Sequence, residues 1–85
     1  MNAQMPIFSG SRLQAAREIK GLSRDQLAAA VASTGVRKTA SRQSVHQWEA
    51  GVTTPGTNVI PVLSDLLGQP HEYFFEQESV ESTRT

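Results

Sequence analysis

The stretch SRQSVHQWEAG, residues 41–51, is the segment on which the predicted fold depends. Ser41 is a typical helix N-cap residue, and Gly51 is a typical residue for ending a helix. Between them Val45 and Trp48 are the large apolar residues, and a spacing of three places both on one helix face. The stretch predicts a helix that buries these two residues and leaves five polar side chains largely free: Arg42, Gln43, Ser44, His46 and Gln47.

Two helical patterns precede this segment. Residues 11–20 carry apolar side chains near helical spacing, and Gly21 follows as a residue able to end that helix. Ser23 lies three residues before Gln26, which is the capping-box spacing. A second helix is therefore predicted to start at Ser23.

The remaining segments alternate between loop and helix. Residues 34–40 have no apolar period and are predicted to be a loop. A fourth helix is predicted to begin at Thr57 or Asn58, because Pro61 is tolerated only in or just beyond a first turn. The stretch PHEYFFEQ, residues 70–77, predicts a short fifth helix.

These patterns predict one small all-α domain. The chain has 85 residues, 38% of them hydrophobic, which is enough for a single modest core and too little for two. We expect a five-helix domain over residues 9–76 and a flexible acidic and polar tail over residues 77–85.

The composition argues against several classes of protein. The chain has no cysteine, so neither a disulfide framework nor a thiolate metal site is expected. No apolar run has the roughly 18 residues of a membrane span, and the first ten residues do not resemble a secretory signal. A soluble, unprocessed protein of the cytoplasm is the resulting expectation.

Charge is unevenly distributed along a chain whose formal net charge is zero. Seven Lys and Arg residues precede Trp48 against two acidic residues, whereas a single Arg follows it against six acidic residues. This separation favours one surface that meets phosphates and another that avoids them. The alternative is that these charges only solvate a small protein.

The pattern as a whole resembles the Xre/Cro-type helix-turn-helix repressors over about residues 10 to 75. The resemblance is carried by RLQAAREIKGLSRDQLA at 12–28, SRQSVHQWEAG at 41–51, Pro55, and VLSDLLGQPHEYFF at 62–75. It implies a lambda-repressor-like bundle that binds double-stranded DNA and represses transcription from a palindromic operator as a homodimer, in a prokaryotic or phage-infected cell. The chain departs from the family in having Arg24 where glutamine is common, and about seven additional residues between Ala28 and Val45.

The resemblance also implies which side chains meet DNA. Arg42 can form two hydrogen bonds to guanine and Gln43 two to adenine in the major groove. The expected base contacts are Arg42, Gln43, Ser44, His46 and Gln47. The expected contacts to the DNA backbone are Arg24, Arg37, Lys38, Ser41, Thr53, Thr54 and Asn58.

A homodimer needs an interface between its two copies, and DNA binding has one rival function. The expected dimer interface consists of Leu66, Leu67, Tyr73, Phe74 and Phe75, with the alternative that these aromatics only close the monomer core. The rival to DNA binding is a protein-interaction module, such as an antitoxin or accessory subunit, that binds a protein partner through its C-terminal half.

Catalytic and metal chemistry have little sequence basis. Glu18 and Asp25 near Arg17 suggest surface ion pairs rather than paired catalytic carboxylates. His46 and Glu49 have a helical spacing, but no third ligand type accompanies them, so no metal site is expected. Neither enzymatic activity nor a cofactor is predicted.

Overall fold

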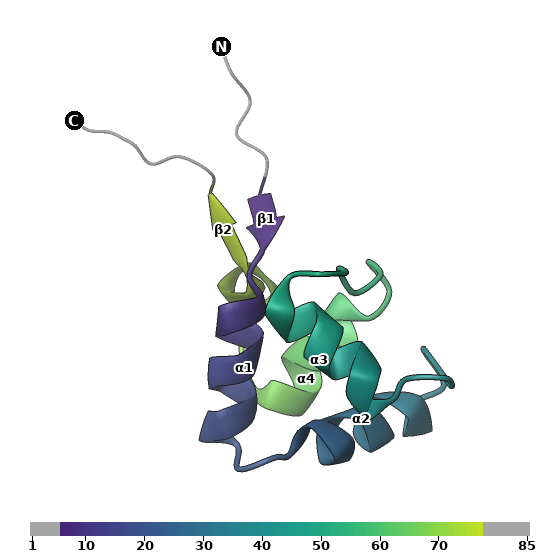
Figure 1. Cartoon of the computed structure of the whole chain (residues 1–85). Coiled ribbons are helices and arrows are strands. Elements are labelled where there is room, and N and C mark those ends of the chain that lie inside the picture. The colour runs from purple at the N-terminus through teal and green to yellow at the C-terminus, as the bar shows by residue number, and fades with distance from the viewer. Residues whose placement is uncertain (1–5, 78–85) are drawn as a thin grey trace, which may run out of the picture.

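The computed structural model describes residues 6–77 as four α-helices, one short 3-10 helix and a two-stranded antiparallel sheet (Figure 1). The elements in chain order are β1 (Pro6–Phe8), α1 (Gly10–Ile19), α2 (Arg24–Ser33), α3 (Arg42–Ala50), α4 (Ile60–Leu67), the 3-10 helix η1 (His71–Phe74) and β2 (Phe75–Gln77).

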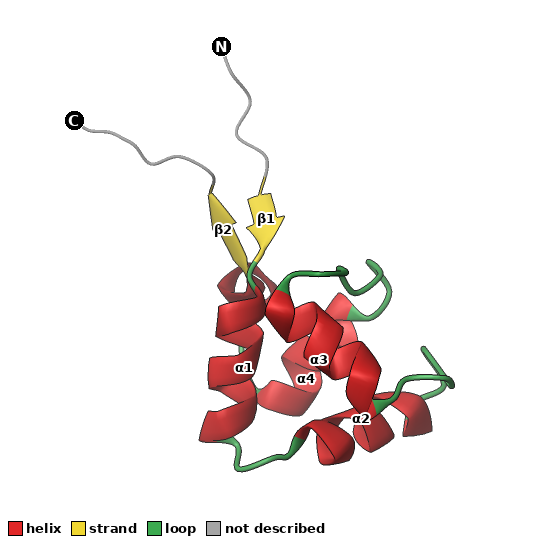
Figure 2. Cartoon of the chain, viewed as in Figure 1, coloured by secondary structure: helices red, strands yellow, loops and turns green. Residues whose placement is uncertain are grey.

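The expected all-α, five-helix bundle is wrong at its C-terminal end. Residues 70–77 form one 3-10 turn and then the strand β2, which pairs with β1 in the register Phe8 to Phe75 (Figure 2). Phe75 has the extended dihedral angles φ −121° and ψ 143°, and a segment this short is a marginal helix in water. Pairing with β1 gives backbone N–H and C=O groups of residues 75–77 the hydrogen-bond partners that they would otherwise find within a helix.

The starts of α2 and α3 follow the predicted capping residues. Ser23 and Gln26 form the expected capping box, with each side chain bonded to the backbone N–H of the other residue. Ser41 caps α3 as predicted, and Gly51 ends that helix with φ +79°. The helix α4 begins at Ile60, two or three residues later than predicted, so that proline falls in its first turn.

The core lies where α3 packs between α1 and α2, with α4 and η1 closing the opposite side (Figure 1). Val45 and Trp48 of α3 are buried as predicted, with exposed fractions of 0% and 1%. The other fully buried large side chains come from every remaining helix and from the residue just before α4: Leu13, Leu27, Val31, Val59, Leu63, Leu67 and Phe74.

One glycine sets the distance between α1 and α3. A Cβ on Gly10 would overlap the backbone carbonyl oxygens of Trp48 and Glu49. Only glycine permits the first turn of α1 to lie directly on the last turn of α3. This close approach brings the side chains of those two helices into contact farther along α1.

The ends of the described chain lie side by side, because Pro6 pairs with Gln77 in the sheet. The strand β1 precedes residue 9, where the sequence places the start of the domain. Except for Gln77, the predicted tail lies outside the described residues. Within residues 6–77, none of the helices combines the length and the hydropathy needed to cross a membrane.

Candidate functional site

An open hollow of about 380 Å³ lies between the start of α2 and the first half of α3. Its lining residues are Arg24 from α2 and Arg42, Gln43 and His46 from α3. Each of these side chains carries N–H groups able to donate hydrogen bonds, and none of the four is a carboxylate. The hollow is therefore suited to an acceptor-rich or anionic ligand.

The α3 side chains on this face are unpaired inside the protein. Arg42, Gln43 and His46 are exposed, and Gln47 is half-buried. Among residues 6–77, these four side chains make no hydrogen bond or ion pair. Their donors are available to an external partner, as the helical pattern of residues 41–51 predicts.

Two of the predicted contact residues are occupied in starting α3. The Ser41 hydroxyl accepts from the Ser44 backbone N–H at 3.3 Å, and the Ser44 hydroxyl accepts from the Ser41 backbone N–H at 3.3 Å. This reciprocal pair satisfies two backbone donors that would otherwise be free at the helix start. Ser41 and Ser44 thus fix the start of α3, and their DNA contacts, Ser41 to the backbone and Ser44 to bases, stay predictions.

Two loops flank α3, over residues 34–41 and 51–59 (Figure 2). The Arg37 guanidinium lies 5.7 Å from the centroid of the Trp48 ring, and the Asn58 side-chain amide donates to the Val36 carbonyl at 3.4 Å. The first loop is thereby tied both to α3 and to the second loop. Arg37 and Asn58 have these contacts within the fold and are nevertheless exposed, as are the remaining predicted backbone contacts in the loops: Lys38, Thr53 and Thr54.

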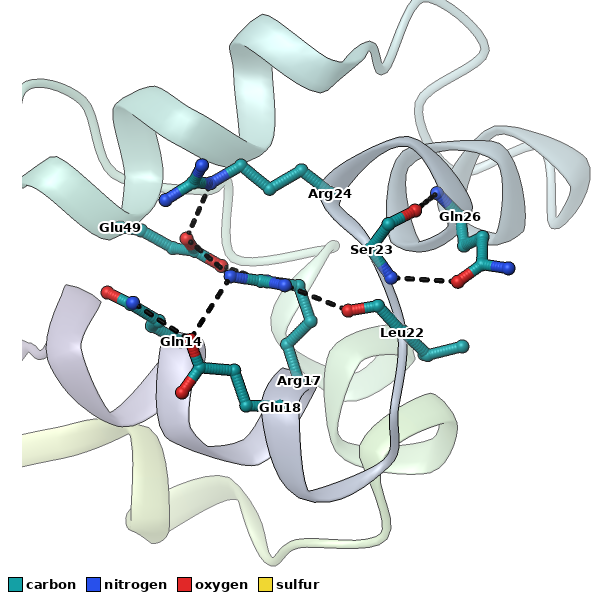
Figure 3. A network of polar contacts seen from close by, with 8 residues as sticks. All are labelled: Gln14, Arg17, Glu18, Leu22, Ser23, Arg24, Gln26 and Glu49. Carbon is teal, nitrogen blue, oxygen red and sulfur yellow. Dashed lines mark hydrogen bonds and ion pairs between the residues drawn. The ribbon is translucent and has the colours of Figure 1, made fainter.

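Behind the hollow, one carboxylate holds two arginines (Figure 3). Glu49 accepts from Arg17 Nε at 2.6 Å and Arg17 Nη2 at 3.3 Å, and from Arg24 Nε at 2.9 Å. The Glu49 side chain is 2% exposed and that of Arg17 is 9% exposed. Arg17 Nη1 also donates to the Leu22 carbonyl at 2.8 Å, so this cluster joins α1, α2, α3 and the connection between α1 and α2.

The Glu49 cluster corrects the sequence-based interpretation of Arg17. Arg17 is not mainly a surface ion-pair partner, since its Nη2 lies 3.9 Å from a Glu18 oxygen but its shorter contacts are to buried Glu49. A signal for this pair was present in the sequence. Arg17 lies four residues after the core residue Leu13, and Glu49 lies four residues after Val45, so each shares the buried face of its helix.

The expected dimer interface mostly belongs to the core of the monomer. Leu67 and Phe74 are 2% and 0% exposed, so neither offers surface to a second copy. Leu66, Tyr73 and Phe75 are half-buried against the same core.

Arg12 further covers these half-buried aromatic residues. Its Nη1 donates to the backbone carbonyls of Tyr73 and Phe75 at 3.1 and 3.3 Å, and its guanidinium lies 5.7 Å from the Tyr73 ring centroid. The aromatic residues thus close the monomer, which was the alternative interpretation. The large apolar residues that are exposed in the described part of the chain lie elsewhere: Ile7, Ile19 and Val52.

Comparison of the chain with protein-family models, with curated proteins and with solved structures finds no match. Within residues 6–77, His, Asp and Glu side chains form no group of three or more that could hold a metal ion. A function for the chain must therefore be argued from the hollow, from the exposed face of α3 and from the Glu49 cluster behind them.

Proposed function

We propose that the chain is a sequence-specific DNA-binding regulator that represses transcription by occupying an inverted-repeat operator as a homodimer. The observation that carries this proposal is the set of exposed, internally unpaired donors on the first half of α3. Arg42, Gln43 and His46 lie on one face there, beside Arg24 at the start of α2.

The chemistry of these side chains fits the major groove of DNA. That groove admits one α-helix, and its base edges present distinct patterns of donors and acceptors. Arg42 matches the two acceptors of guanine, and Gln43 matches the acceptor and donor of adenine. Each such two-bond contact discriminates against a wrong base by about 1 to 3 kcal/mol.

Residues around this face suit the sugar-phosphate backbone. Arg24 contributes a cation beside the N-terminus of α2, where the helix dipole also favours an anion. Lys38 in one flanking loop, and Thr53 and Thr54 in the other, are exposed donors on either side of α3. Contacts of this kind fix the orientation of a protein on DNA without reading its sequence.

Pairing of two copies is part of the proposal because one domain of this size forms a small DNA interface. Two copies on half-sites about one helical turn apart double the number of base contacts. The rival function, a protein-interaction module acting through the C-terminal half, has less support, because Leu67 and Phe74 are closed inside the monomer.

The test is selection of a random pool of double-stranded oligonucleotides on the purified protein. We expect an inverted repeat to be enriched by the wild type and not by Arg42→Ala. Lys20→Gln is the matched control, since it also removes one positive charge but lies beside Gly68 at the end of α4. Enrichment of no sequence at low salt, or equal enrichment by Arg42→Ala, contradicts the proposal.

A further inference from the structure

Only part of the Arg24 guanidinium is hydrogen-bonded within the described part of the protein. Its Nε donates to Glu49 Oε1 at 2.9 Å. Among residues 6–77, its two terminal nitrogens make no hydrogen bond or ion pair, and Nε alone is joined to Glu49 (Figure 3). The side chain is 32% exposed and lines the hollow.

The charge of Glu49 is already balanced without Arg24. Arg17 contacts both carboxylate oxygens of Glu49, which is the two-bond geometry that satisfies an arginine and a carboxylate. Arg24 adds a second positive charge to the single negative charge of Glu49, and the other carboxylate near the cluster, Glu18, lies 3.9 Å from Arg17 and is 59% exposed. Glu49 alone therefore does not cancel the charge of Arg24, which remains available to an anion in the hollow.

The carboxylate of Glu49 is itself held in place. It is 2% exposed. Arg17, which donates two hydrogen bonds to it, also donates to the Leu22 carbonyl. A fixed acceptor at Nε restricts the rotamers of Arg24, and a restricted side chain loses less conformational entropy when a ligand binds.

We propose that Glu49 is a positioning residue for DNA binding, which orients Arg24 so that its two terminal nitrogens bind one backbone phosphate. This inference rests on the proposed function and adds a residue that makes no contact with DNA. It also explains why arginine suits position 24. A lysine ammonium is a single nitrogen on a flexible stem, so it cannot bond to Glu49 through one nitrogen and to a phosphate through two others.

Exchange of Arg24 for lysine tests these contacts while keeping the positive charge. We expect Arg24→Lys to weaken binding to the selected operator about 10-fold or more, nearly as much as Arg24→Gln. Lys20→Gln, outside the site, should stay within about 2-fold of the wild type. Arg24→Lys binding as tightly as the wild type overturns the inference.

A double-mutant cycle separates positioning from folding. Glu49→Gln should weaken DNA binding in the wild type but have little further effect in Arg24→Lys. Its effect on the thermal midpoint, which acts through Arg17, should persist in both backgrounds. An equal loss of affinity in both backgrounds would show that Glu49 does not act through Arg24.

Nuclear magnetic resonance gives a readout that does not require Glu49 to be changed. The Arg24 Nε–H signal, assigned by its absence in Arg24→Lys, should remain protected from exchange when operator DNA is added. Loss of that protection in the complex means that Arg24 leaves Glu49 on binding and overturns the inference. If the wild type binds no DNA, the proposed function fails as well, whereas binding by the wild type with an unaffected Arg24→Lys refutes the positioning role alone.

Discussion

Glu49 in the last turn of α3 and Arg17 in the last turn of α1 form a buried two-bond ion pair, with distances of 2.6 and 3.3 Å. Burying two charges is costly unless their hydrogen bonds are satisfied, and here most of them are. The pair therefore links the stability of the fold to the orientation of Arg24, which bonds to Glu49 and lines the hollow.

Removal of Arg17 should destabilise the fold. A buried charge left without any partner costs about 3 to 5 kcal/mol, and in Arg17→Met the Glu49 carboxylate keeps Arg24 as its one partner, so we expect a loss below that range but above about 1 kcal/mol. Urea unfolding followed by fluorescence of Trp48, the single tryptophan, measures the change. Glu18→Gln removes the exposed partner at 3.9 Å and should change stability by less than about 1 kcal/mol. Equal stability of Arg17→Met and the wild type would mean that the pair contributes nothing.

Replacement of Gly10 by alanine should also destabilise the protein, although helix propensity predicts the opposite. Alanine is favoured over glycine in helices by about 1 kcal/mol, but here the new Cβ would overlap the Trp48 and Glu49 carbonyl oxygens. We expect the urea midpoint to fall, because α1 and α3 must separate. Gly21→Ala is a useful comparison, since that glycine has φ +73° but open space around it, so only backbone strain acts there. A rise in the midpoint of Gly10→Ala would contradict the close helix contact.

Features of the fold that depend on nearby residues were largely predicted from the sequence. The caps Ser23 and Ser41, the terminating Gly51 and the buried pair Val45 and Trp48 all depend on neighbours within a few residues, and all were found as expected.

Features that depend on distant segments were not predicted. Phe8 and Phe75 pair in a sheet across most of the chain, and three-residue strands carry almost no periodic signal. Arg17 and Glu49 were interpreted separately because charged residues are seldom buried unless paired, and the partner of each lies 32 residues away. For Tyr73, Phe74 and Phe75 the sequence leaves a dimer interface and a closed monomer core as alternatives, because it does not indicate which apolar surface the monomer itself covers.

The Arg12 contacts should hold the C-terminal elements onto α1. Arg12→Met keeps the apolar stem but removes the donors to the Tyr73 and Phe75 carbonyls. We expect faster hydrogen exchange at the Ser9 amide, which donates to the Phe74 carbonyl at 2.7 Å, because local opening of η1 and β2 becomes easier. Global stability should fall by only about 1 kcal/mol, since Arg12 is largely exposed. An unchanged exchange rate at Ser9 would show that the strand pair closes this end without Arg12.

Salt dependence should separate phosphate contacts from base contacts on the proposed DNA-binding face. Each phosphate neutralised by a Lys or Arg releases counterions, so the slope of log affinity against log salt should become shallower by about 1 when one such contact is lost. We expect this change in Arg24→Gln on both operator and random DNA. In Gln43→Ala the slope should stay the same, and the loss of affinity should be confined to operator DNA, because a neutral side chain that reads a base releases no counterions. Titrations by fluorescence anisotropy at several salt concentrations give both quantities, and an unchanged slope in Arg24→Gln would remove Arg24 from the phosphate contacts.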